Sequence, residues 1–423
     1  MKKRLIYLDN ASTTSLDPHV LKVMLPYLKN NFGNPSNLYE ISRKAGFAVK
    51  NATEIISRVL HCRPDEFVFT GSATESDNLA ILGVARANKK NGNRIIVSQI
   101  EHKGVLALAE VLRKEGFEVI EISVQKDGLI DLEELQKNIT PQTVLVSITS
   151  ADSETGTIQP IQEISKIIKT FRTKNNSTFP YFHTDASQSA GYLDTDVEKL
   201  GVDMMTFSAH KIHGPKGIGG LYVKRGVNIE PIMYGGGQQG RLRSGTENVP
   251  GIVGFAEAFK INKINKKVQN EKLKKMRDTL EKGIFKSIPK VVLNGHKTKR
   301  LPGFLNISLL DVEGEAILLH LDQLGIMVNT GSACNSQSLE PSYVLSALGN
   351  PYEYVHGSIR FSLGSENTMS DITYVLKHLP NVIQRLRAIS PLDLTMGEKK
   401  TISDPRAFIG NQTPYFLRKK NKN

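Results

Sequence analysis

Apolar runs of strand length alternate with helical segments over residues 14–259, and this alternation restricts the fold more than any other feature. The predicted strands cover residues 66–70, 94–98, 118–122, 143–149, 181–184, 204–208 and 221–224, and the clearest helices cover 45–60, 77–87 and 104–115. Strands that are apolar along their whole length and are separated by helices are typical of a parallel sheet buried on both faces. The sequence therefore predicts an α/β domain with a mainly parallel sheet covered by helices.

The pattern changes after residue 260. A long lysine-rich helix is predicted over residues 262–286, followed by strands at 291–293, 305–309 and 358–362 and by a helix that begins at Gly314. We expect residues 14–260 to form a large cofactor-binding domain, and residues 1–13 with 261–390 to form a smaller α+β domain. Residues 391–423 are polar with few apolar anchors, so we expect them to wrap the surface or to be disordered.

The composition of the 423 residues narrows the function classes. No apolar run approaches the ~20 residues that a membrane helix needs, and no signal-peptide core is present, so a cytoplasmic location is expected. The net charge of +13 is concentrated in residues 260–275 and 418–423, where no aromatic residues interleave the basic ones. Direct nucleic-acid binding is therefore not expected, and an acidic protein partner fits the charge better.

Two cysteines, Cys62 and Cys334, are too few for a disulfide framework, and their spacing is not that of a metal site. Cys62 follows an apolar helix end and is interpreted as a structural thiol. Cys334 lies in a run of Gly, Ser, Ala and Asn, which predicts an exposed loop. An accessible thiol that becomes a thiolate is a nucleophile, so Cys334 is the candidate for chemistry.

Lys211 follows a predicted strand and precedes a Gly-Pro turn. A lysine at the end of a buried strand is costly unless it is bonded, and an imine with a carbonyl cofactor is one use for it. A lone lysine in such a place is more commonly a solvent-exposed loop residue. Asp185 changes this balance, because it ends another apolar strand and pyridoxal phosphate needs an anion beside its pyridinium nitrogen. Since the carboxyl ends of parallel strands line one crevice, we expect Asp185 and Lys211 to share a site.

A phosphate cradle is predicted at residues 69–78, where a strand passes through Gly71 and small residues into a helix. The free N–H groups and the dipole of a helix N-terminus suit a phosphate. An ordinary capping arrangement of Thr74 with Asp77 explains the same residues and is compatible with a phosphate site.

These segments together resemble the cysteine desulfurases, pyridoxal-phosphate enzymes that supply sulfur for iron–sulfur clusters and thiolated tRNA. The resemblance extends from residue 5 to about residue 391, although several motifs are shared with the wider class-V aminotransferase group. The matching runs include Tyr7-Leu8-Asp9-Asn10, Gly33-Asn34-Pro35-Ser36, Glu101-His102-Lys103 and Ser358-Ile359-Arg360. Gly331-Ser332-Ala333-Cys334 is similar to the type that acts in general or nitrogenase cluster assembly. The resemblance implies the pyridoxal-phosphate fold of type I.

The resemblance also implies roles for individual residues. Lys211 would hold the cofactor and later move the Cα proton, while Cys334 would take the sulfur as a persulfide. His102 would stack on the cofactor ring and assist proton transfer. Arg360 would bind the substrate carboxylate with support from Asn34. The implied cofactor ligands are Ala73, Thr74, Ser153, Asp185, Gln188, Ser208, His210, Lys211 and, from the second subunit of a homodimer, Thr246.

The implied reaction converts L-cysteine to L-alanine and delivers the sulfur to an iron–sulfur scaffold protein or another acceptor, for cluster biogenesis or tRNA thiolation. No resident metal is implied, although Cys334 could transiently ligate a cluster on a scaffold. Two alternatives stay open. One is a selenocysteine lyase or other class-V aminotransferase-like enzyme, and the other is a catalytically weakened partner protein in sulfur transfer.

Two departures from the family pattern keep the second alternative open. The family carries Asn-Asn-Glu where this chain has Asp152-Ser153-Glu154, and Ser153 is expected to reach the phenolic oxygen of the cofactor only through water. Two residues after Gly237 the family has an acidic residue, often followed by Arg and Gly, whereas this chain has Gln239-Gly240-Arg241.

Overall fold

The structure, a computed structural model, describes residues 4–331 and 341–390. Predictions about Cys334 and about residues 391–423 therefore fall outside the described residues. The α-helices are α1 (Pro18–Lys29), α2 (Glu40–Leu60), α3 (Ala73–Ala87), α4 (Lys103–Lys114), α5 (Leu132–Asn138), α6 (Ile161–Lys174), α7 (Val197–Leu200), α8 (Val249–Ser287), α9 (Gly314–Gln323), α10 (Tyr343–Ala347), α11 (Tyr352–His356) and α12 (Met369–Ile389). The strands are β1 (Ile6–Tyr7), β2 (Phe67–Thr70), β3 (Arg94–Ser98), β4 (Glu118–Ile122), β5 (Thr143–Ser147), β6 (Tyr181–Asp185), β7 (Met204–Ser208), β8 (Gly219–Val223), β9 (Val291–Asn294), β10 (Phe304–Leu309), β11 (Ile326–Met327) and β12 (Ser358–Ser362). Short 3-10 helices are η1 (Pro64–Glu66), η2 (Ala209–Lys211) and η3 (Gln238–Arg241).

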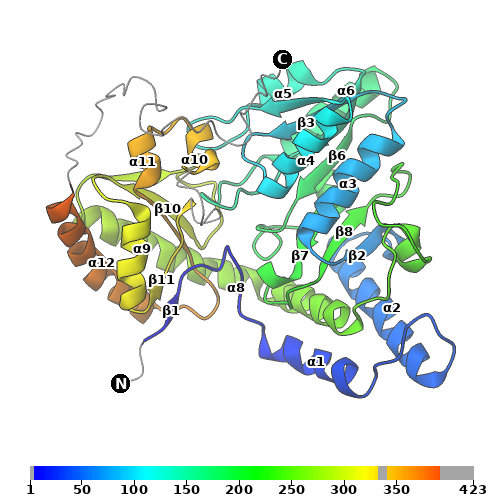
Figure 1. Cartoon of the computed structure of the whole chain (residues 1–423), viewed down its shortest axis with the longest axis horizontal. Helices are drawn as coiled ribbons and strands as arrows, with labels where there is room; N and C mark the ends of the chain where they lie inside the picture. Colours follow the sequence, from blue (N-terminus) through cyan, green and yellow to red (C-terminus); the bar gives the residue numbers. More distant parts are fainter. Residues whose placement is uncertain (1–3, 332–340, 391–423) are drawn as a thin grey trace, which may run out of the picture.

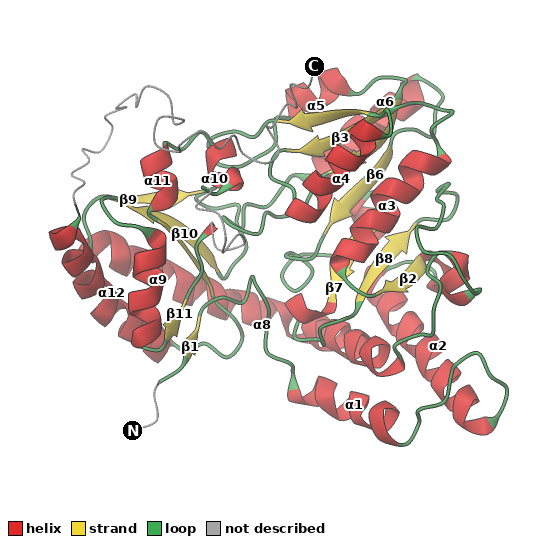
Figure 2. Ribbon diagram, viewed as in Figure 1, coloured by secondary structure: helices red, strands yellow, loops and turns green. Residues whose placement is uncertain are grey.

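The large sheet has seven strands in the order β2-β8-β7-β6-β5-β3-β4 (Figure 2). The strands from β7 to β4 are parallel, whereas β8 is antiparallel to both of its neighbours. The predicted α/β class with a mainly parallel sheet is therefore confirmed. Because β8 is antiparallel to both β2 and β7, these two strands run in the same direction and end at the same edge of the sheet.

Helices cover both faces of this sheet (Figure 1). One face packs with α2, α6 and the first part of α8, and the other face packs with α3 and α4. Neighbouring strand residues alternate between these two cores: Phe67 and Phe69 belong to the first, and Val68 belongs to the second. Both faces of each strand are thus buried, which explains why the strands read as continuous apolar runs.

A separate, small core lies around an antiparallel sheet of β12, β10 and β9, together with the short parallel pair of β1 and β11. The N-terminal strand therefore packs with the C-terminal part of the chain. Helix α12, which the sequence reasoning did not identify, closes this core with Ile372, Val375 and Leu379.

Helix α8 begins before the predicted start at residue 262. Its N-cap is Asn248, whose side chain accepts from the backbone N of Gly251 at 3.1 Å, and a proline follows in the first turn, where helices tolerate it. The first part of α8 packs into the large core through Phe255, and the last part packs into the small core through Met276. One helix thus serves both cores, and the expected boundary at residue 260 falls inside it.

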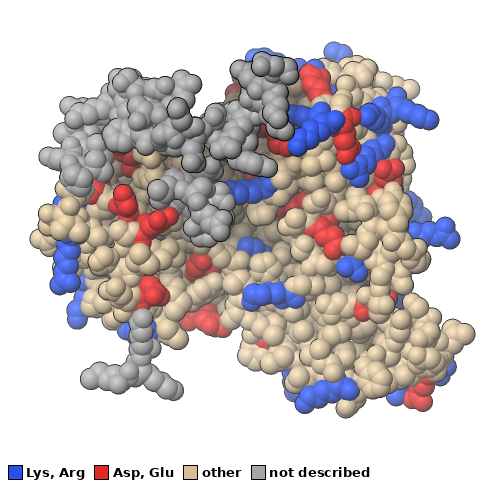
Figure 3. All heavy atoms as spheres, in the orientation of Figure 1, with Lys and Arg blue, Asp and Glu red and all other residues tan. Residues whose placement is uncertain are grey.

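The surface carries charges of both signs. On the face drawn in Figure 3, lysine and arginine side chains are interspersed with acidic ones, a mixture typical of a solvated surface. Within the described part of the chain, none of the helices combines the length and hydrophobicity that crossing a bilayer requires.

Candidate active site

A cavity of about 270 Å³ opens at the edge of the large sheet where the parallel strands end. The segments that follow β2, β3, β5, β6 and β7 supply its walls. The predicted site residues that line it are Ala73, Thr74, His102, Ser153, Asp185, Gln188, Ser208, His210 and Lys211. The topology thus brings together residues that the sequence separates widely, while their individual roles stay predictions.

The cavity offers the chemical groups that pyridoxal phosphate requires. Asp185 ends β6 and Lys211 lies just after β7, which is the parallel neighbour of β6. The first turn of α3 and Ser208 supply donors for a phosphate at the same cavity. The hydroxyl of Ser187 is buried there and has no hydrogen-bond partner among the described residues, so polar capacity is left for a ligand. The residues present therefore fit this cofactor.

Asp185 is a carboxylate beside a second, more deeply buried carboxyl group. Its Oδ1 accepts from the backbone N of Ser187 at 2.8 Å. Burial, and then the negative charge of Asp185, raise the pKa of Asp77 well above its ordinary value. His183 Nε2 lies 3.7 Å from Asp77 Oδ1, but burial lowers the pKa of His183 to about 3 and leaves the imidazole neutral. Burial and the neighbouring Asp185 therefore favour the protonated form of Asp77.

The interpretation that Thr74 and Asp77 cap the helix is wrong, because other residues form the cap. Ser72 is the N-cap of α3 and accepts from the backbone N of Glu75 at 3.1 Å, while Glu75 Oε2 accepts from the backbone N of Gly71 at 2.7 Å. The cap therefore lies earlier in the chain, because a serine oxygen reaches the N–H group three residues on. This places Thr74 in the first turn of α3, where backbone N–H groups lack helical partners.

Lys211 is held by the segment that follows β1. Its Nζ donates to the carbonyl oxygens of Ala11 and Ser12, the latter at 2.9 Å. Gln188 Nε2 donates to the same Ala11 carbonyl at 3.0 Å. The N-terminal segment thus forms part of the site, which the sequence reasoning did not anticipate. The available signal was the polar pair after the apolar run at residues 5–8.

The two candidate histidines have different surroundings. His102 is the N-cap of α4, and its Nδ1 accepts from the backbone N of Gly104 at 3.1 Å. His210 Nδ1 lies 3.0 Å from Thr13 Oγ1, and burial is the main cause that lowers the pKa of His210 to about 4. His210 is therefore neutral near pH 7 and can donate one N–H group to a phosphate.

Glu101 lies fully buried behind the cavity wall. Its Oε1 accepts from Ser98 Oγ at 2.5 Å and from the backbone N of Thr149 at 2.8 Å, whereas Oε2 is buried with no partner among the described residues. Burial raises the pKa of Glu101 from 4.5 to about 8. The folded chain therefore keeps a proton on this carboxyl group at neutral pH.

This proton makes the stability depend on pH. Between about pH 4.5 and pH 8 the folded chain binds a proton that the unfolded chain has lost, so the free energy of unfolding falls as the pH rises through this window. The Glu101→Gln variant keeps the shape but cannot ionise. The free energy of unfolding of the variant, measured in urea, is expected to rise relative to that of the wild type by about 1–3 kcal/mol between pH 5 and pH 8. The exposed Glu133→Gln variant should show no such gain, and an equal difference at both pH values would contradict the assignment.

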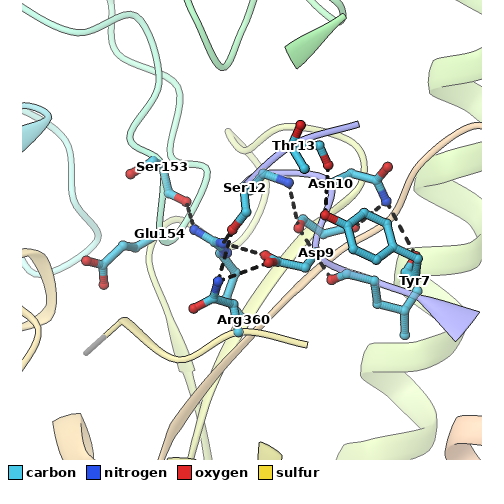
Figure 4. A network of polar contacts seen from close by, with 12 residues as sticks. Tyr7, Asp9, Asn10, Ser12, Thr13, Ser153, Glu154 and Arg360 are labelled. Carbon is cyan, nitrogen blue, oxygen red and sulfur yellow. Dashed lines mark hydrogen bonds and ion pairs between the residues drawn. The ribbon is translucent and has the colours of Figure 1, made fainter. Parts of the chain in front are cut away.

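Arg360 reaches the site from β12 of the small sheet (Figure 4). Its Nη2 donates to Asp9 Oδ1 at 2.6 Å and to Ser12 Oγ at 2.9 Å. Its Nη1 donates to the carbonyl of Ser153 at 2.8 Å, and its Nε is buried with no partner among the described residues. Asn329 Nδ2 completes the network by donating to Asp9 Oδ2 at 3.0 Å and to Ser12 Oγ at 2.9 Å.

Asn34 does not take part in this network. Its Oδ1 accepts from the backbone N of Ser36 at 3.0 Å, and no hydrogen bond of the described residues joins Asn34 to Arg360. The expected support of substrate binding by Asn34 stays a prediction. Within the described residues it is Asn329 whose backbone pairs with that of Arg360.

The departure at residues 152–154 has a structural consequence. Asp152 is buried, and its Oδ1 accepts from the backbone N of Glu154 and of Thr155 at 2.9 and 2.7 Å. Its Oδ2 accepts from the backbone N of Thr157 at 3.0 Å. An asparagine has one acceptor oxygen and cannot make all three bonds in this way. Asp152 thus organises the turn that presents Ser153 to the cavity and to Arg360.

The second departure lies at the edge of the large sheet. Gln239 Oε1 accepts from the backbone N of Phe69 at 2.8 Å, which satisfies a donor of the edge strand β2. Arg241 is exposed. Thr246 is also exposed in the single chain, and its predicted contact with a second subunit stays a prediction.

Cys62 lies against the large hydrophobic core, and burial raises its pKa to about 11. A thiol with this pKa is almost entirely protonated near neutral pH, so it is a poor nucleophile. The interpretation of Cys62 as a structural thiol is confirmed.

Comparison with known proteins gives a consistent result. Residues 6–375 match the family model described as aminotransferase class-V. A cysteine desulfurase IscS of Clostridium botulinum is 47% identical over 389 residues, which cover 92% of this chain and 96% of the relative. One of Methanosarcina thermophila is 45% identical over 391 residues, covering 92% and 95%. Among solved structures, a NifS-like protein superposes with a TM-score of 0.84 at 36% identity over 90% of this chain and 100% of its own. Another, from Rickettsia africae, has a TM-score of 0.79 at 31% identity with the same coverage.

Proposed function

The chain belongs to the class-V aminotransferase family and is a pyridoxal-phosphate-dependent cysteine desulfurase, in which, we propose, Lys211 holds the cofactor and Cys334 accepts the sulfur. The observation that carries the proposal is the meeting of Asp185 and Lys211 at one cavity, at the ends of adjacent parallel strands. An acid and an amine so placed are the pair that this cofactor needs.

Residues around the cavity have separate roles in holding the cofactor. Bound pyridoxal phosphate supplies an electron sink for the charge left when the substrate Cα loses its proton. Asp185 would provide the anion for the ring nitrogen, beside Asp77, whose raised pKa favours its protonated form. Thr74, Ser208 and His210 would hold the phosphate.

Three further residues would act on the substrate. Arg360 binds the carboxylate of L-cysteine, and the Nζ of Lys211 removes the Cα proton, with His102 assisting. The Cys334 thiolate attacks the substrate sulfur, so that an S–S bond forms as the Cβ–S bond breaks. The electron pair of the broken bond stays with the carbon and takes up a proton, which yields alanine and a persulfide on Cys334.

The proposal includes a homodimer in the cytoplasm that passes sulfur to a scaffold protein or another acceptor. A second subunit is supported by exposed large apolar side chains on and beside α1 and α2, which a monomer would leave in water. They are Leu21, Leu25, Leu28, Phe32, Leu38, Tyr39 and Phe47. The cytoplasmic location is supported by the scarcity of cysteine.

The test is incubation of the cofactor-loaded protein with L-cysteine, followed by measurement of alanine and of the mass of the peptide that contains Cys334. We expect one alanine per sulfur released and a mass gain of one sulfur atom on that peptide. Alanine from L-selenocysteine but not from L-cysteine would favour the selenocysteine lyase. Absence of alanine from both would favour a weakened partner protein.

A further inference from the structure

The guanidinium of Arg360 is already occupied by an anion of the same chain. A guanidinium binds a carboxylate through two parallel N–H groups, along either the Nε–Nη2 edge or the Nη1–Nη2 edge. Both edges need a hydrogen atom of Nη2. In this chain one Nη2 hydrogen goes to Asp9 and the other goes to Ser12, so neither edge is free.

The occupied guanidinium lies next to the reacting groups. Ser12 accepts from Arg360 through its hydroxyl and from Lys211 Nζ through its carbonyl, at 2.9 Å in each case. Ser153, which lines the cavity, accepts from Nη1 of the same guanidinium. A substrate whose amino end lies at Lys211 therefore has its carboxylate near the position that Asp9 fills.

Asp9 is itself held in place. Asn329 donates to its second oxygen at 3.0 Å, and the side chains of Asp9 and Arg360 are 15% and 10% exposed. Water and salt screen such a buried pair only weakly, so the attraction between Asp9 and Arg360 is strong. A substrate carboxylate that binds Arg360 must therefore overcome this attraction. The buried Nε of Arg360, without a partner among the described residues, shows that the present arrangement does not satisfy the guanidinium fully.

We propose that Asp9 is a positioning residue that sets substrate specificity by holding Arg360 until the carboxylate of an amino acid displaces it. The proposal rests on the proposed function for the identity of the substrate. A plain carboxylate must displace Asp9 with one contact only. An amino acid adds the contact of its amino group at Lys211, so it displaces Asp9 more readily. Asp9 thus excludes simple organic acids from the site.

The test compares the wild type with Asp9→Asn, which keeps the size and an acceptor oxygen but removes the charge. The probe is 3-mercaptopropionate, which has the carboxylate and thiol of cysteine without the amino group, and its binding to the cofactor-loaded protein is measured by calorimetry. We expect the Kd for this probe to fall about five- to tenfold in the variant. We expect the KM for L-cysteine to fall as well, with a smaller change in kcat.

Two controls isolate the effect. Cysteamine, which lacks the carboxylate, should bind the wild type and Asp9→Asn equally. Asp17→Asn makes the same chemical change at the N-cap of α1, where asparagine caps as well as aspartate, and should leave both probes unchanged. Should Asp9→Asn not fold, Ser12→Ala removes the hydroxyl that accepts from the other Nη2 hydrogen of Arg360. This variant is expected to lower the Kd for 3-mercaptopropionate by about twofold.

Unchanged or weaker binding of 3-mercaptopropionate by a folded variant overturns the proposal, and so does an equal shift for both probes. Tighter binding of the carboxylate probe in a protein that forms no alanine from cysteine would refute the proposed function and leave the role of Asp9 intact.

Discussion

The Lys211→Ala variant is expected to form alanine from L-cysteine at a rate lower by roughly 10⁴-fold or more. General acid–base catalysis alone contributes about 10²–10⁴-fold, and the variant also loses the amine that holds the cofactor. Asp185 and the first turn of α3 remain, so the variant should still bind the cofactor without a covalent bond. Mass spectrometry after borohydride reduction measures this difference directly: the wild-type peptide that contains Lys211 carries the cofactor, and the variant peptide does not.

A matched control for this experiment is Lys216→Ala. Lys216 is an exposed lysine on the loop that follows η2. It should retain wild-type activity and the reduced cofactor adduct on Lys211. If the adduct were found on another lysine, or if Lys211→Ala kept more than a small share of the activity, the assignment of Lys211 would be wrong.

The second large effect is expected for Cys334→Ala. Without this thiolate nothing attacks the substrate sulfur, so alanine formation from L-cysteine should fall by roughly 10²-fold or more while the cofactor stays bound. The chain supplies its own control, because Cys62 is its other cysteine. Cys62→Ala should keep the wild-type rate, since burial already keeps that thiol protonated.

The two cysteine variants also separate the candidate mechanisms. Persulfide detected on Cys334 in the Cys62→Ala protein would support direct transfer from the substrate. Full alanine formation by Cys334→Ala would rule out attack by this residue and favour a lyase that releases the chalcogen without a protein thiol.

The parts of the site that local pattern revealed are those at strand ends. Asp185 and Lys211 each follow an apolar run, and the rule that parallel strands end at one edge was enough to expect them together. The turn that we propose for the phosphate was also visible as a strand that leads through glycine into a helix. The error there concerned which side chain caps α3. Several polar residues near the start of α3 could serve as the N-cap. Ser72 does so because its hydroxyl lies within reach of the backbone N of Glu75.

What local pattern did not reveal depends on contacts between distant parts of the chain. Asp9 and Arg360 are 351 residues apart, and nothing in either neighbourhood specifies the other. The raised pKa of Asp77 likewise follows from burial beside Asp185, and burial is known only once the elements have packed. Helix α8 was placed too late because its first part has no charge pattern and is defined by the core that it enters.

The amino-acid sequence alone thus determined the α/β class, the strand ends that carry Lys211 and Asp185, and the apolar surroundings of Cys62. Side-chain periodicity and turn residues act over a few positions, so these features can be predicted from short stretches of sequence. Only the tertiary structure decided that the N-terminal segment lies against Lys211, that Asp9 pairs with Arg360, and that the pKa of Asp77 is raised. These outcomes depend on distance and on exclusion of water, and both arise only when distant parts of the chain pack together.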